Sequence, residues 1–265
     1  VPERTPVQRL TTLLGSSRAD MDDRLASTQF ASRLLNILNN ESFDAIHIEG
    51  LELSPYLQQI AAQRGAASTP LLIYDAHNAE TVIQRRALLT DRLQIRRWPA
   101  AFYSGLQLPR LAKLERQTCE RADAVLCVSK EDCAALRLLL PGLKPMIVPN
   151  GIFLSEYTDM VKPAALPEPA LVFSGKMNYR PNVDGALWFA REILPRIRKI
   201  YSGATFVIVG KAPVPSIKRL AHDPRIIVTM SVPDVRPLIA AATVFLAPLR
   251  MGGGTRFKLL EAMAL

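Results

Sequence analysis

The sequence predicts an α/β fold in two domains, residues 1–149 and 150–265, each built on a doubly wound parallel sheet. In the second half, apolar strand candidates at 170–174, 205–209, 226–229 and 243–247 alternate with helical stretches. Such alternation is typical of parallel strands joined by crossover helices. The first half has strand candidates at 43–48, 71–74, 124–128 and 146–148. Pro163, Pro167 and Pro169 lie in a stretch without period, which indicates a linker after Asn150.

Helical periodicity is expected in the first half over 20–40, 51–64, 81–121 and 130–140, whereas residues 1–15 show no convincing period. Asp20 and Asp22 have the Asp-x-Asp spacing of metal-dependent transferases. They open a helix instead of following a strand, however, and acidic residues at a helix start are an ordinary dipole effect.

Composition indicates a globular protein and narrows its partners. Hydrophobic residues make up 49% of the chain, and the longest nearly uncharged run, 237–249, is too short to span a bilayer. Residues 1–12 are too polar for a signal peptide. The net charge of +9 is concentrated in residues 151–265, with 15 Lys or Arg against 8 Asp or Glu, which favours an anionic ligand or surface. Nucleic acid is not expected, because no basic cluster is interleaved with several aromatic residues.

Three cysteines, Cys119, Cys127 and Cys133, form no disulfide framework, and we expect all three to be reduced in a cytoplasmic protein. The chain has no initiator methionine, and Leu265 stands in a helical run that has no terminating glycine, asparagine or proline. We therefore expect a piece of a longer chain.

The segment 81–121 is helical in pattern and basic, with Trp98, Phe102 and Tyr103 in its middle. Its basic residues are Arg85, Arg86, Arg92, Arg96, Arg97, Arg110, Lys113, Arg116 and Arg121. A basic helix with aromatic residues can lie on an anionic membrane. A solvated helix face, on which Asp91, Glu115 and Glu120 balance part of the positive charge, is the favoured alternative.

Three consecutive glycines at 252–254 stand between an apolar strand candidate and a helical run. A glycine turn ahead of a helix presents free backbone N–H groups where the helix dipole is positive, so it can bind a phosphate. Lys258 and Glu261 follow at helical spacing and share one face, while Phe257 falls on the neighbouring face and is expected to pack inward. A cation followed one turn later by a carboxylate suits the phosphate and sugar of a nucleotide.

The same stretch also fits simpler explanations. Three glycines before a helix can form a flexible connection, and Lys258 with Glu261 can form a surface pair. The stretch lacks the Gly-Lys-Ser/Thr that ends a Walker loop, and it lacks the Gly-x-Gly-x-x-Gly pattern of dinucleotide-binding sites. Phosphoryl transfer and NAD chemistry are therefore weak hypotheses.

Polar side chains also follow the strand candidate that ends at position 74. They are Asp75, His77, Asn78 and Glu80, and residues past the carboxyl end of a parallel strand line the ligand crevice of an open sheet. The alternative is a polar turn in which Asn78 or Thr81 caps the next helix. A metal site is not expected, because the other histidines have no ligand spacing to this group.

A second polar loop follows the strand candidate 170–174. Lys176 and Arg180 can reach the carboxyl end of that strand, and Pro181 suits the start of a helix. The alternative is that Lys176 and Arg180 are ordinary cations on the protein surface.

The stretch GGGTRFKLLEAMA at 252–264 resembles the nucleotide-binding motif of retaining GT-B glycosyltransferases of family 4, the group 1 transferases. ADAVLCVSKEDCAAL at 122–136 and IVPNGI at 147–152 resemble the end of the family's N-terminal domain, and DAHNAE at 75–80 is similar to its exopolysaccharide-type branch. The resemblance implies a GT-B fold, in which two Rossmann-like domains face each other across a cleft. Relative to the family, both domains are expected to be incomplete.

The resemblance also implies roles for single residues. Glu261 matches the family's ribose-binding glutamate, whereas the family's first glutamate would fall at Gly253. Lys176 is implied at the donor diphosphate and His77 at the donor sugar, so His77, Lys176 and Lys258 are the expected catalytic residues. Donor binding is expected from Gly175, Arg180, Gly210, Val232, Gly252, Gly253, Gly254, Thr255 and Glu261. Asn78 and Glu80 are expected on the acceptor side, with neither a metal nor a cofactor.

The expected function is transfer of a sugar from a nucleotide-diphosphate donor to an acceptor hydroxyl with retention, in exopolysaccharide or other cell-surface glycan synthesis. The acceptor would be a glycan or lipid-linked molecule, and the protein cytoplasmic, with peripheral membrane contact through 81–121. Two alternatives stay open. One is a GT-B nucleotide-sugar 2-epimerase, which would release free sugar without an acceptor, and the other is a non-catalytic nucleotide-binding fragment.

Overall fold

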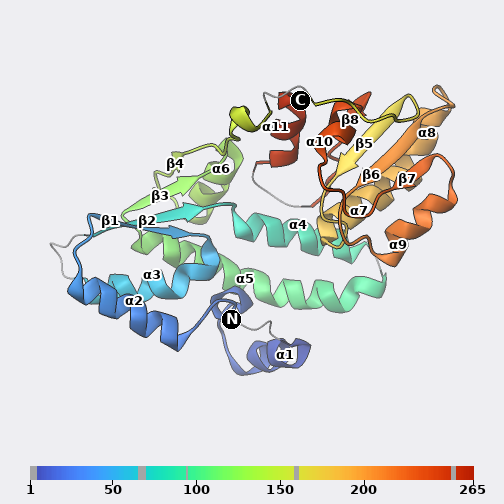
Figure 1. The fold of residues 1–265 in the computed structure, drawn as a ribbon. Coiled ribbons are helices and arrows are strands. Elements are labelled where there is room, and N and C mark those ends of the chain that lie inside the picture. Colours follow the sequence, from blue (N-terminus) through green and yellow to red (C-terminus); the bar gives the residue numbers. More distant parts are fainter. Residues whose placement is uncertain (1–4, 65–69, 94, 158–160, 252–254) are drawn as a thin grey trace. The chain divides into compact units, whose positions relative to one another are not determined.

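The computed structural model describes residues 5–64, 70–93, 95–157, 161–251 and 255–265, which form two compact units (Figure 1). The first unit runs to Pro149, and the second begins at Asn150 and includes the last helix. Within the described residues, each unit has a four-stranded sheet whose neighbouring strands are all parallel. Parallel strands need crossover connections, and helices supply most of them in both units.

In the first unit the strands lie in chain order. They are β1 (Ala45–Glu49), β2 (Leu71–Ala76), β3 (Ala124–Cys127) and β4 (Met146–Ile147). Along β2, Leu72, Tyr74 and Ala76 are fully buried and alternate with more exposed residues. One face of β2 therefore belongs to the core, and the strand ends immediately before His77.

Most helices of the first unit pack against this sheet or against one another, while α1 contacts η1 (Figure 1). They are α1 (Pro6–Gly15), α2 (Thr28–Asn40), α3 (Ser54–Gln63), α4 (Glu80–Arg92), α5 (Trp98–Arg121) and α6 (Lys130–Leu139), with short 3-10 helices η1 (Asp20–Asp23), η2 (Leu51–Leu53) and η3 (Ile95–Arg97). Leu57 of α3, Leu111 of α5 and Leu136 of α6 share one core cluster with the strands.

Two expectations for the amino-terminal residues are wrong. Residues 6–15 form helix α1, because Thr5 and Gln8 make a capping box and Pro6 suits the first helical position. Residues 20–40 do not form one helix. The chain is extended at Ser27, whose hydroxyl accepts a hydrogen bond from the Phe30 N–H and starts α2 there.

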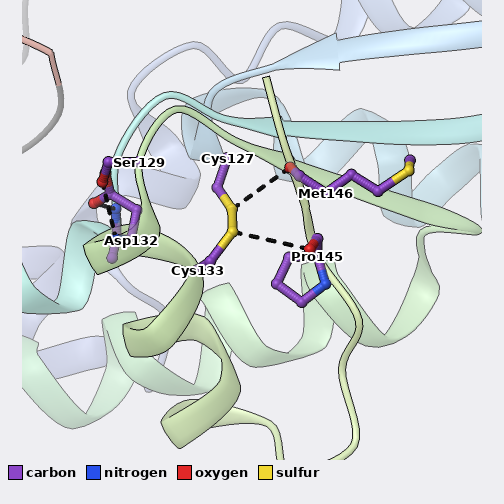
Figure 2. Close-up of a disulfide and its surroundings, with 7 residues drawn as sticks. Cys127, Ser129, Asp132, Cys133, Pro145 and Met146 are labelled. Carbon is purple, nitrogen blue, oxygen red and sulfur yellow. Dashed lines mark hydrogen bonds between the residues drawn. A yellow bond between two sulfur atoms is a disulfide. The ribbon is translucent and has the colours of Figure 1, made fainter. Parts of the chain in front are cut away.

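The expectation that all three cysteines are reduced is also wrong. Cys127, the last residue of β3, forms a disulfide with Cys133 in the first turns of α6, while Cys119 of α5 is free and buried (Figure 2). The tight turn from strand to helix brings the two Cα atoms to 5.9 Å, within the range that a disulfide bridges. Figure 2 shows Ser129 and Asp132 beside this bond.

In the second unit the strand order is β7-β6-β5-β8. The strands are β5 (Ala170–Ser174), β6 (Thr205–Val209), β7 (Ile226–Val228) and β8 (Val244–Phe245). The helices are α7 (Arg180–Trp188), α8 (Leu194–Arg198), α9 (Pro215–Lys218), α10 (Arg236–Ala240) and α11 (Phe257–Ala264), with η4 (Leu154–Tyr157), the π-helix η5 (Phe189–Ile193) and η6 (Arg219–His222). Every residue of β5 and β6 is buried, as apolar runs covered by helices on both faces require.

The segment after β8 is anchored to α7. Arg250 makes a bidentate pair with Asp184, at 2.9 and 2.6 Å, and its guanidinium lies 5.6 Å from the centre of the Trp188 ring. α7 comes so close to this segment that a Cβ on Gly185 would lie 2.5 Å from the Pro248 carbonyl oxygen. These contacts fix the positions of Pro248 and Arg250, which precede α11 in the chain.

Candidate functional site

Lys258, in the first turn of α11, directs its ammonium group to the end of β5. Its Nζ donates hydrogen bonds to the Ser174 carbonyl oxygen (2.6 Å) and to Oδ1 of Asn182 (3.2 Å), and lies 4.5 Å from the centre of the Phe173 ring. Partial burial, and then the nearby Arg256, lower the pKa of Lys258 to about 8, although Glu261 opposes the shift. Carbonyl oxygens do not neutralise the positive charge, so the ammonium group can attract an anion.

Two glycines follow neighbouring strands of this sheet. Gly175 follows β5 with φ +153 and Gly210 follows β6 with φ +154, conformations that favour glycine. A Cβ on Gly210 would lie 1.7 Å from the Gly175 carbonyl oxygen, and a Cβ on Gly175 would lie 2.9 Å from Nζ of Lys258. The ends of β5 and β6 therefore pack closely together, with Lys258 beside Gly175, and neither glycine has room for a side chain.

Asn182, in the first turn of α7, joins Lys258 to the loop after β5. Its buried side chain donates from Nδ2 to the Lys176 carbonyl oxygen (3.0 Å) and accepts from Lys258. The side chain of Lys176 is exposed, and Arg180 begins α7 in a half-buried position. The structure thus brings the Lys176 backbone, Asn182 and Lys258 together, and Asn182 is a residue for which the sequence analysis assigns no role.

Glu261 lies one turn after Lys258, and its carboxylate is hydrogen-bonded to the hydroxyl of Tyr157 in η4. Burial, and then the Glu261 carboxylate, raise the pKa of that hydroxyl. Val232 is half-buried and packs against the core around β5 and β6. The inward packing expected for Phe257 is wrong, since the side chain is 47% exposed at the start of α11.

The remaining donor-side predictions concern the glycine turn. Thr255 is half-buried. Gly252, Gly253 and Gly254 lie outside the described residues, so their contacts stay a prediction.

In the first unit, His77 is exposed directly after β2 and lies beside Gly50. A Cβ on Gly50, whose φ is +84, would lie 3.9 Å from Nδ1 of His77 and 3.2 Å from Oε2 of Glu52. Arg24 pairs with Glu52 at 3.4 Å. His77 and Glu52 therefore lie close to the same glycine, where strands β1 and β2 end.

Glu80 begins α4, and its carboxyl group is in a mostly buried, acidic environment. Burial, and then the carboxylates of Glu52 and Glu115, raise the pKa of Glu80 to about 7, while Arg24 and a hydrogen bond with Asn78 oppose the shift. Such a group can gain or lose a proton near neutral pH.

The start of α4 is held by side chains from other helices. Glu115 of α5 accepts from the Glu80 N–H (Oε1, 2.6 Å) and from the Thr81 N–H (Oε2, 3.2 Å), and Asp132 of α6 accepts from the Ala79 N–H (Oδ1, 3.0 Å). The expected alternative of an Asn78 or Thr81 cap is wrong, because Ala79 is the N-cap residue and α4 has no side-chain cap of its own.

Glu52 and Asp132 were not predicted to take part in a site. Glu115 and Asp91 were predicted on a solvated helix face, which is wrong, since both are buried. A signal existed for Glu115, since it stands between Leu114 and Thr118 on the buried face of α5, where a carboxylate is unusual. Among the described residues, no three His, Cys, Asp or Glu side chains gather closely enough to hold a metal ion. None of the described helices is both long and apolar enough to cross a membrane.

The two units match models of known protein families. A family model described as Glycosyltransferase Family 4 matches residues 3–156, and one described as Glycosyl transferases group 1 matches residues 168–265. No curated protein matches the chain.

Several solved structures have a similar fold. Sucrose-phosphate synthase from Thermosynechococcus elongatus superposes with a TM-score of 0.64 at 16% identity, over 89% of this chain and 57% of that chain. The α,α-trehalose-phosphate synthase from Burkholderia xenovorans, in complex with glucose-6-phosphate, superposes with a TM-score of 0.58 at 12% identity. The match covers 89% of this chain and 58% of that chain. The catalytic domain of starch synthase IV from Arabidopsis thaliana, bound to ADP and acarbose, superposes with a TM-score of 0.53 at 14% identity. The match covers 88% of this chain and 57% of that chain.

These comparisons confirm the predicted GT-B fold and the predicted family resemblance. The chain spans somewhat more than half the length of these structures.

Proposed function

Because the chain belongs to glycosyltransferase family 4, we propose that the protein transfers a sugar from a nucleotide-diphosphate donor to an acceptor hydroxyl. The observation that carries this proposal is the position of Lys258, a half-buried ammonium group at the carboxyl end of β5 beside Gly175. Ligands of open α/β sheets bind outside the carboxyl ends of the strands. A cation at this edge suits the diphosphate of the donor.

In this proposal the donor diphosphate binds Lys258, the exposed side chain of Lys176 and the backbone of 252–255. Glu261 takes the ribose hydroxyls, exchanging its hydrogen bond to Tyr157 for the sugar. Arg180 adds positive charge, and Gly175 and Gly210 are proposed to contact the donor through their backbone. Val232 lies in the segment that we propose near the base.

During transfer, the bond between C1 of the sugar and the diphosphate oxygen breaks, and a bond from C1 to the acceptor oxygen forms. The acceptor proton passes to the departing diphosphate. Negative charge grows on that diphosphate, and Lys258 and Lys176 stabilise it, so we propose that no metal ion is required. Retention would follow from attack on the face that the diphosphate leaves, without a covalent nucleophile. His77, in the first unit, is proposed to contact the donor sugar.

We propose a glycan or lipid-linked acceptor bound on the side of Asn78 and Glu80, in exopolysaccharide or other cell-surface glycan synthesis. A carboxyl group that exchanges its proton near pH 7, as the pKa of Glu80 allows, suits contact with an acceptor hydroxyl. A cytoplasmic location fits the Cys127–Cys133 disulfide only if that bond forms and breaks reversibly, as disulfides of cytosolic proteins usually do.

The end of the α4–α5 hairpin, residues 85–106, is the surface that we propose contacts an anionic membrane. Its exposed apolar side chains are Leu89, Leu93, Ile95, Trp98, Phe102 and Leu106. A groove of about 600 Å³ opens there, with Leu88, Trp98 and Phe102 in its lining. Exposed arginines, among them Arg92 and Arg96, accompany them. Apolar side chains surrounded by cations suit the boundary between lipid headgroups and acyl chains.

The donor site is tested by titrating the protein with UDP, GDP and ADP in a calorimeter. Lys258→Ala and Glu261→Ala are expected to weaken binding of the preferred nucleotide by about tenfold or more, the usual effect of losing a hydrogen bond to a charged group. Lys199→Ala, which removes an exposed cation at the end of α8, is the control. Equal affinity in Lys258→Ala and wild type would remove Lys258 from the site.

The reaction is tested with the matching nucleotide sugar. Transfer predicts nucleoside diphosphate release that accelerates when an acceptor hydroxyl is added, with the sugar linked to that acceptor in the donor's anomeric configuration. Release of free sugar at the same rate without acceptor would favour the 2-epimerase. Nucleotide binding without any release would favour a binding fragment.

A further inference from the structure

The turn that carries His77 is attached to the rest of the first unit by backbone amides. β2 ends at Ala76, and α4 begins at Glu80 with Ala79 as its N-cap residue. The first amides of a helix have no acceptor within the helix. An alanine cap has no side-chain oxygen to supply one, so the acceptors must come from elsewhere.

Two buried carboxylates supply them. Glu115 of α5 is 1% exposed and accepts from the Glu80 and Thr81 amides at 2.6 and 3.2 Å. Asp132 of α6 is 7% exposed and accepts from the Ala79 amide at 3.0 Å. Three successive amides are therefore bound by side chains from two helices that lie 34 to 53 residues further along the chain.

Asp132 is itself fixed in place. Its carboxylate accepts from the Ser129 hydroxyl, and the Ser129 oxygen accepts from the Asp132 N–H at 3.1 Å. The next residue, Cys133, is tied to the end of β3 by the disulfide with Cys127 (Figure 2). The carboxylate that binds Ala79 is thus attached to the neighbouring strand of the sheet.

Burying carboxylates is costly, and a serine or aspartate at position 79 would cap α4 without it. Burial raises the pKa of Glu115, and the Thr81 and Glu80 hydrogen bonds oppose that shift. What the two carboxylates achieve beyond a local cap is a connection between the His77 turn and helices α5 and α6.

We infer that Glu115 and Asp132 are positioning residues for His77, holding the Ala79, Glu80 and Thr81 amides so that the imidazole stays beside Gly50 and Glu52. This inference rests on the proposed function only for its effect on sugar transfer. The position of His77 itself can be measured without a reaction.

The first test is by NMR on the whole chain, following the imidazole signals of His77 and the exchange of the Ala79, Glu80 and Thr81 amides. Glu115→Ala and Asp132→Ala are expected to shift the His77 signals and to speed amide exchange. Glu115→Gln, which keeps one acceptor oxygen, is expected to fall between Glu115→Ala and wild type, so it guards against simple unfolding. Glu131→Gln, next to Asp132 but exposed, and Glu120→Gln, in an exposed pair with Arg116, are the matched controls.

The second test is kinetic. In Glu115→Ala and Asp132→Ala, kcat for sugar transfer is expected to fall roughly tenfold or more, since small displacements of reacting groups have such effects. The affinity for nucleoside diphosphate should not change. Partial recovery in Glu115→Gln would support positioning over loss of charge.

One result would overturn the inference: faster amide exchange in Glu115→Ala with unmoved His77 signals, which would leave Glu115 as a helix cap only. Full kcat in variants whose His77 signals have moved would instead contradict the proposed role of His77 in transfer. A wild-type protein that transfers no sugar would instead contradict the proposed function, and the NMR results would still decide the positioning of His77.

Discussion

Nζ of Lys258 lies 2.6 Å from the carbonyl oxygen of Ser174, so helix α11 is hydrogen-bonded to the end of β5. Asn182 adds a second bond from the start of α7. Two stretches that the sequence analysis treats as separate parts of a donor site are therefore one connected group. A diphosphate that binds Lys258 would meet the loop of Lys176 at the same strand end.

Nucleotide affinity is expected to depend on pH through Lys258. Burial and Arg256 lower the pKa of its ammonium group to about 8, so the group loses its charge as pH rises through that value. Calorimetric affinity for the preferred nucleoside diphosphate should therefore fall as pH rises from 7 to 9. In Lys258→Arg the guanidinium stays protonated, and the fall should disappear. The same fall in the arginine variant would mean that another group causes it.

Side chains at the two strand-end glycines are expected to be tolerated poorly. Gly210→Ala would place a Cβ 1.7 Å from the Gly175 carbonyl oxygen, which only a backbone shift can relieve. We expect it to lower the free energy of unfolding by about 2 kcal/mol or more in urea titrations. Gly151→Ala is the control, because no atom lies within 4 Å of a Cβ at that position. Equal stability of the two variants would contradict the close approach.

Glu80→Gln is expected to stabilise the protein at neutral and higher pH. The carboxyl group titrates near 4.5 when unfolded and at about 7 when folded. Between these values the native state binds more protons than the unfolded state, so the free energy of unfolding falls as pH rises. Glu80→Gln has no carboxyl group at this position, so its free energy of unfolding does not fall in this way. Its Tm should match wild type near pH 4.5 and exceed it at pH 8, with Glu131→Gln as control. A Tm difference that does not change with pH would show that Glu80 has an ordinary pKa in the folded protein.

The hairpin end at 85–106 is expected to bind anionic vesicles. More of the protein should sediment with phosphatidylglycerol vesicles than with phosphatidylcholine vesicles. Phe102→Ala, at a side chain that is 70% exposed, should weaken retention by about tenfold, as loss of a buried aromatic side chain predicts. Arg96→Glu should also weaken it, in a salt-dependent way. Leu138→Ala, at an exposed position of α6, is the control. Equal retention of all variants would exclude this surface.

Reduction is expected to destabilise the first unit. Dithiothreitol should lower the free energy of unfolding by about 2 kcal/mol, because the disulfide closes a short loop between Cys127 and Cys133. The double variant Cys127→Ser, Cys133→Ser should not respond to the reductant. An equal lack of response in wild type would show that the two thiols stay reduced in solution.

Much of the fold follows from short stretches of sequence. The apolar runs at 170–174 and 205–209 form β5 and β6 with the predicted limits, because strands buried on both faces are continuously apolar. The predicted strand at 243–247 shrinks to β8, Val244–Phe245, because only those residues pair with β5. Helix α1 was missed because its stability comes from a capping box and a proline at its start, with no clear apolar period.

Side-chain partners were harder to predict than the elements that carry them. Cys127 and Cys133 stand in the predicted strand and helix, yet their bond depends on the angle at which α6 leaves β3. A cap by Asn78 or Thr81 was the alternative prediction for the start of α4, since capping is usually local. In the structure the carboxylate of Glu115 takes that place.

The sequence by itself determined the α/β class, the strand–helix alternation, the family resemblance, and the placement of Lys258 and Glu261 on one helix, since these depend on local spacing. Only the tertiary structure decided that Lys258 meets Asn182, 76 positions away in the chain, and that Glu115 meets Glu80, 35 positions away. Such contacts depend on how helices pack against the sheets, and that packing results from the burial of many side chains together.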